Sequence, residues 1–93
     1  MKRNEAAAIA DQHLRPYRAR TYDALLTLLQ HREFFEGRTD TGDRYSGVVY
    51  ALWDDRPQGN LRVWADVSWG GHSDFAPVTQ TFIIAPDGSF VGE

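Results

Sequence analysis

Residues 69–74 read Trp-Gly-Gly-His-Ser-Asp and hold the residue types closest to those of a catalytic loop. The imidazole of His72 titrates near neutral pH, and Asp74, two residues later, could orient it as a general base. The same composition is typical of a long polar connection between two strands, which is the interpretation we favour. His72 and Asp74 therefore remain loop or pocket candidates, and no residue is predicted to be catalytic.

The residue types that hold metals are present but wrongly spaced. The chain has no cysteine, which excludes disulfides, thiol catalysis and cysteine-based zinc sites. Its histidines, His13, His31 and His72, form no His-x-x-x-His pair beside an acidic residue. Residues 40–43 (Asp-Thr-Gly-Asp) lack the spacing of a calcium loop, and no glycine pattern matches a phosphate-binding loop. The sequence predicts neither a metal site nor a cofactor.

Arg15, Arg18 and Arg20 cluster around Pro16 and Tyr17, a combination that can bind nucleic acid. Residues 1–32 carry six basic and three acidic residues, a net charge of +3, whereas residues 33–93 carry four and ten, a net charge of −6. The arginines can therefore pair with the acidic part of the same chain. We expect no nucleic-acid partner.

Helical spacing extends to about residue 32. The first predicted helix has Asn4 as its N-cap and ends or kinks at Pro16. Its apolar stripe is formed by Ala6, Ile9, Ala10 and Leu14. His13 falls on this stripe and is expected to be a partly buried structural residue. A second helix is predicted to begin after Thr21 and to end at His31. Leu28 lies off its apolar face, which is formed by Tyr22, Leu25, Leu26 and Leu29.

The remaining sequence alternates strands and turns. Strands are predicted at 34–35, 45–53, 61–69, 78–85 and 89–91. Pro-x-Gly turns at 57–59 and 86–88, with glycine in the left-handed position, indicate tight hairpins between antiparallel neighbours. We therefore predict one α+β domain over residues 1–93. In it, two N-terminal helices pack on a curved, four- to five-stranded antiparallel meander sheet.

This element order resembles the cystatin-like or nuclear-transport-factor-2-like α+β roll. Residues 81–93 also look like the terminal hairpin of several small bacterial domains of unknown function. The roll implies a small-ligand pocket between helix and sheet, suited to isomerase or hydrolase chemistry. Its polar candidates here would be His13, Tyr22, Asp66 and His72.

Strand 61–69 alternates most clearly. Leu61, Val63, Ala65, Val67 and Trp69 share one side, and Arg62, Trp64, Asp66 and Ser68 share the other. In strand 45–53 both sides are apolar, so Trp64 and Tyr50 or Leu52 are expected to form a patch on a sheet face that the helices leave open.

The patch predicts a non-catalytic binding or assembly domain whose interface includes Tyr50, Arg62, Trp64 and Asp66. A homodimer is the expected assembly, because Arg62 can face Asp66 of a second copy across a two-fold axis. The alternatives are the pocket described above and an immunity-type protein that binds a protein partner. The N-terminal residues resemble neither a signal peptide nor a membrane span, so we expect a cytoplasmic protein with no membrane partner.

Overall fold

The computed structural model describes residues 1–70 and 77–92. Helix α1 (Arg3–Arg18) is followed by a short helix α2 (Tyr22–Leu25), which continues as the 3-10 helix η1 (Leu26–Leu29). Five strands follow: β1 (Glu33–Arg38), β2 (Arg44–Trp53), β3 (Leu61–Trp69), β4 (Val78–Ile84) and β5 (Phe90–Val91). The predicted α+β class, with helices first and an antiparallel meander second, is confirmed.

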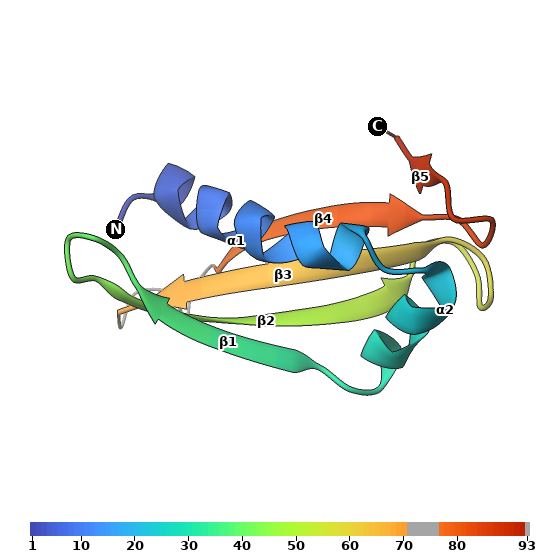
Figure 1. Cartoon of the computed structure of the whole chain (residues 1–93), viewed down its shortest axis with the longest axis horizontal. Helices are drawn as coiled ribbons and strands as arrows, with labels where there is room; N and C mark the ends of the chain where they lie inside the picture. Colours follow the sequence, from blue (N-terminus) through green and yellow to red (C-terminus); the bar gives the residue numbers. More distant parts are fainter. Residues whose placement is uncertain (71–76, 93) are drawn as a thin grey trace.

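The strands form one antiparallel sheet in the order β1-β2-β3-β4-β5. Figure 1 shows α1 lying along β3 and β4, with α2 at the end of the sheet where β2 finishes and β3 starts. The helix α1 contacts β3 and β4, and η1 contacts β2. The helices therefore cover one face, the inner face. We call the opposite face the outer face, and no described helix packs on it.

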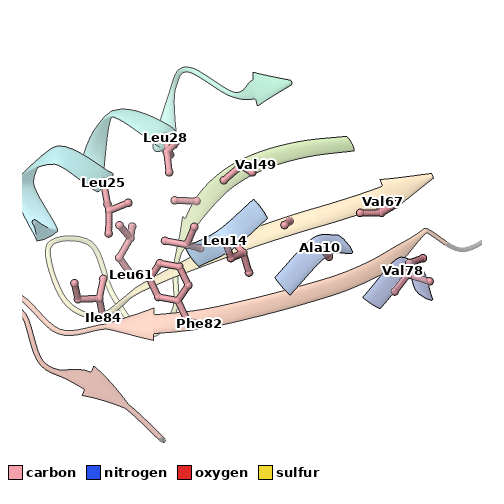
Figure 2. Close-up of a cluster of buried hydrophobic side chains, with 14 residues drawn as sticks. Ala10, Leu14, Leu25, Leu28, Val49, Leu61, Val67, Val78, Phe82 and Ile84 are labelled. Carbon is pink, nitrogen blue, oxygen red and sulfur yellow. The ribbon is translucent and has the colours of Figure 1, made fainter. Parts of the chain in front are cut away.

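Among the residues that the structure describes, fourteen buried apolar ones fill the space between the helices and the inner face. Alternate residues of β3 supply its centre, and Leu14, Leu25 and Leu28 close over them from the helical side, as Figure 2 shows. The predicted inward residues Leu61, Val63, Ala65 and Val67 are confirmed in this core.

The ends of α1 differ from the prediction. Its N-cap is Lys2, whose carbonyl oxygen accepts hydrogen bonds from the amides of Glu5 and Ala6, so the expected cap at Asn4 is wrong. The helix also continues past Pro16 to Arg18. Proline removes one helical hydrogen bond and crowds the carbonyl four residues before it, and the packing of α1 on β3 and β4 outweighs that cost.

The second helical segment is wound more tightly than an α-helix after Leu25. Because a 3-10 helix has three residues per turn, Leu28 lies directly above Leu25, and both are buried in the core. The prediction that Leu28 lies off the apolar face is therefore wrong. His31 lies beyond the last helical residue, Leu29, and is exposed, so it does not end the helix as expected.

One of the two Pro-x-Gly turns forms as predicted. Gly88 takes a left-handed φ of +90°, and its amide donates to the Ala85 carbonyl over 2.9 Å. In the other turn Gln58, with φ of 68°, occupies the left-handed position instead of Gly59. Gly59 is needed for close packing, because a Cβ there would lie 2.6 Å from Oδ1 of Asp55.

Candidate functional site

The loop with catalytic residue types lies largely outside the described residues. Trp69 ends β3 and Gly70 follows in a left-handed conformation with φ of 57°. The candidates His72 and Asp74 fall in residues 71–76, which the structure does not describe. Their role as loop candidates stays a prediction.

The outer face carries Tyr50 and Trp64, which we call the aromatic pair. They are direct neighbours across β2 and β3, and their rings are parallel within 2°, with centroids 6.0 Å apart. The guanidinium carbon of Arg32 lies 4.7 Å from the Tyr50 centroid, and that of Arg62 lies 5.7 Å from the Trp64 centroid. Both distances allow cation–π attraction, so two arginines flank the aromatic pair and partly shield it.

Asp66 and Arg62 lie on the same face as Trp64, as the alternation predicts. The Asp66 carboxylate accepts hydrogen bonds from the Thr79 hydroxyl (2.6 Å) and the Tyr50 hydroxyl (3.1 Å). Burial and this neighbouring carboxylate raise the pKa of Tyr50. Arg62 donates from Nε to Asp54 over 2.9 Å and from Nη1 to the Thr81 hydroxyl over 3.1 Å. The two charges are thus held in place by their own chain.

The indole N–H of Trp64 is buried and has no hydrogen-bond partner. Over the part of the chain that the structure describes, it is the only buried side-chain nitrogen or oxygen in this state. An unmade bond of this kind costs about 1–3 kcal/mol. The larger apolar area of the indole and its stacking on Tyr50 oppose that cost within the single chain.

Three exposed apolar side chains extend this surface. Phe34 is 78% exposed, Leu52 51% and Val91 37%, and the strand register places all three on the outer face. Sequence reasoning missed Phe34 and Arg32, because their positions relative to the aromatic pair depend on how β1 pairs with β2. Scattered exposed apolar residues are ordinary, but a group on one uncovered face is typical of an interface.

An open depression of about 650 Å³ lies on the outer face beside the aromatic pair. Phe34 and Val48 contribute apolar walls, and Ser46, Asp66 and Ser68 contribute polar groups. Its described lining also includes the Glu36 carboxylate. The depression therefore combines an apolar wall with hydrogen-bonding groups and is open enough to receive a side chain.

Of the polar residues expected in an inner pocket, the three that the structure describes are not brought together, and His72 lies outside the described residues. Asp66 lies on the outer face, whereas His13 stacks on Phe35 with ring centroids 3.8 Å apart under α1. The Tyr22 hydroxyl donates to the Gly59 carbonyl over 2.6 Å, which ties α2 to the β2–β3 turn. The interior between helices and sheet is occupied by the apolar core.

The environment of His13 predicts a loss of stability in mild acid. Burial lowers its pKa below the ordinary value of 6.5. Above that value the imidazole is neutral whether the chain is folded or unfolded, so it adds no pH dependence. As the pH falls below it, the unfolded chain binds a proton that the folded chain still excludes, and the free energy of unfolding decreases.

Urea unfolding between about pH 7.5 and about pH 5.5 measures this effect. His13→Gln is expected to flatten the decline, since His31 and His72 remain in both proteins. Equal pH slopes for the wild type and the variant would show that His13 titrates normally.

Two residues of the arginine cluster, Arg18 and Arg20, make contacts within the chain. Arg18 lies 4.8 Å from the Phe82 ring centroid, and Arg20 pairs with Glu33 at 3.3 Å. The Glu33 carboxylate also accepts a hydrogen bond of 2.7 Å from Tyr17. Burial and this carboxylate raise the pKa of Tyr17 to about 12. Of the three arginines, Arg20 therefore pairs with the acidic part of the chain, whereas Arg18 packs on an aromatic ring of the sheet.

Within residues 1–70 and 77–92, no group of three or more His, Asp or Glu side chains could hold a metal ion. The helices of these residues are too short or too polar to span a membrane. Comparison with protein-family models, curated proteins and solved structures finds no match for this chain.

Proposed function

We propose that this chain is a non-catalytic assembly domain that forms a homodimer through the outer face of its sheet. The observation that carries this proposal is that three of the four large apolar side chains exposed in the described residues, Phe34, Leu52 and Val91, lie on the face that no described helix covers. The fourth, Phe90, pairs with Ile84 on the other side of the sheet. Burying such side chains against a second apolar face contributes about 25 cal/mol for each Å² removed from water.

The aromatic pair and its arginines support the same proposal. Tryptophan, tyrosine and arginine are the residue types enriched at the energetic centres of protein interfaces. Tyr50, Trp64 and Arg62 lie together between the exposed apolar residues. For the fold, we infer a roll of the cystatin-like kind, supported by a long first helix that packs across an antiparallel meander.

Leu52→Glu tests the assembly. The substitution places a charge in the proposed contact, and it is expected to raise the dimer dissociation constant by about tenfold or more. Ala8→Glu is the matched control, because Ala8 is an exposed apolar residue on α1 in the helical layer. Sedimentation equilibrium over a concentration series measures both variants.

The control should keep the wild-type dissociation constant. A wild-type dimer that Leu52→Glu leaves unchanged would place the contact elsewhere. A wild type that is monomeric throughout, but binds a different protein through Leu52, would replace self-association with the immunity-type alternative.

A further inference from the structure

We infer that the two-fold axis of the dimer runs across the strands, along the row formed by Tyr50, Trp64 and Thr81. This inference rests on the proposed function, because it specifies how two outer faces meet. The three residues are direct cross-strand neighbours on β2, β3 and β4. Under this axis each residue of the row faces its own equivalent in the second copy.

The charge pattern selects this axis. Arg62 and Asp66 lie on β3 two residues to either side of Trp64, on the same face. A two-fold axis along the row exchanges these positions, so Arg62 of each copy faces Asp66 of the other. The interface then contains two equivalent pairs of opposite charge.

The apolar residues of β2 favour the same axis. Val48 and Leu52 lie on β2 two residues to either side of Tyr50, so the axis sets Leu52 of one copy against Val48 of the other. A two-fold axis parallel to the strands, between β2 and β3, would instead set Val48 against Asp66 and Leu52 against Arg62. That arrangement buries each charge against an apolar side chain, which is costly.

Both charged groups keep hydrogen-bonding capacity for a partner. The hydrogen bonds of Arg62 to Asp54 and Thr81 use Nε and Nη1, and a guanidinium has five N–H donors. The side chain remains 31% exposed. The Asp66 carboxylate accepts two bonds of about four that its oxygens can take. The contacts within one chain orient the groups without saturating them.

The depression on the outer face is placed to receive a side chain of the second copy. Val48 and Asp66 line its wall, and these are the two residues that the axis sets opposite Leu52 and Arg62 of the second copy. Leu52 is 51% exposed and lies beside Arg62, in the cross-strand row next to that of Tyr50 and Trp64 on the outer face. The depression of each copy can therefore receive Leu52 of the other, in an aligned packing of two sheets.

A charge-exchange experiment tests the axis. Arg62→Asp leaves two acidic groups at each contact, and Asp66→Arg leaves two basic groups, so each variant alone is expected to dimerise at least about tenfold more weakly than the wild type. An equal mixture of the two variants restores opposite charges at both contacts. It is therefore expected to form a heterodimer with an affinity close to that of the wild type.

A mixture that associates no better than either variant alone would overturn the axis. The proposed homodimer would still stand if the wild type dimerises and Leu52→Glu weakens it. Far-UV circular dichroism checks that both variants fold, because Asp66→Arg removes the bonds to Tyr50 and Thr79.

Cross-linking provides a test that keeps both charges. The wild type has no cysteine, so Thr81→Cys introduces a single thiol on the axis. A short bismaleimide is expected to join Thr81→Cys to itself, because the two thiols face each other. Thr27→Cys, exposed in the helical layer, is the matched control and should remain unlinked. Equal linking of the two variants would contradict the axis.

Discussion

Leu28→Ala is expected to lower the free energy of unfolding by about 2–5 kcal/mol. Leu28 is only 1% exposed in the core, where it lies one 3-10 turn after Leu25. The truncation leaves a cavity that the surrounding helix and strand can close only in part. Urea unfolding followed by tryptophan fluorescence measures the loss.

Leu29→Ala is the matched control, because it makes the same chemical change at a half-buried neighbour. It should cost less than Leu28→Ala. Continuous α-helical spacing would place Leu29 on the apolar face and Leu28 off it. A larger loss for Leu29→Ala would therefore contradict the 3-10 winding of η1.

Gly47→Ala is expected to lower the free energy of unfolding by about 1–3 kcal/mol, although alanine usually stabilises a strand relative to glycine. Gly47 lies directly opposite Phe35 across β1 and β2. A Cβ at position 47 would overlap the Phe35 ring and lie 2.6 Å from the Asp66 carbonyl oxygen. The ring cannot move freely, because His13 stacks on its other side.

A double-mutant cycle isolates the cause. In a Phe35→Ala background the ring is gone, so Gly47→Ala should cost less than it does in the wild type. An equal cost in both backgrounds would assign the effect to the backbone contact with Asp66 alone. A stabilising Gly47→Ala would contradict the close packing of Phe35 on β2.

The alternation of β3 could be predicted because its cause is local. Successive side chains of a strand point to opposite faces, and only one face of β3 is apolar throughout. The outward positions of Arg62, Trp64 and Asp66 follow from the sequence alone. The hairpins follow in the same way, since Pro-x-Gly segments connect neighbouring strands too closely for any crossover.

The winding of η1 could not be predicted in this way. An α-helix places Leu29 on the apolar face and Leu28 off it, whereas the 3-10 helix that contacts β2 places Leu28 above Leu25 in the core. The end of α1 has a similar explanation. Pro16 locally favours the end of the helix, but the packing of α1 on the sheet stabilises the helical conformation as far as Arg18.

The candidate site was predicted only in part, because part of it depends on pairing. Phe34 and Arg32 reach the outer face near Tyr50 only once β1 is aligned with β2. Their sequence positions give no sign of this alignment. The hydrogen bonds that fix Asp66 likewise come from β2 and β4, from residues 16 and 13 positions away.

The mass of the wild-type chain in solution tests the proposed assembly most directly. Sedimentation equilibrium across the micromolar range is expected to show a mass that rises from the 10.6 kDa of one chain toward twice that value. A mass of 10.6 kDa at every concentration would show that the outer faces of two copies do not meet.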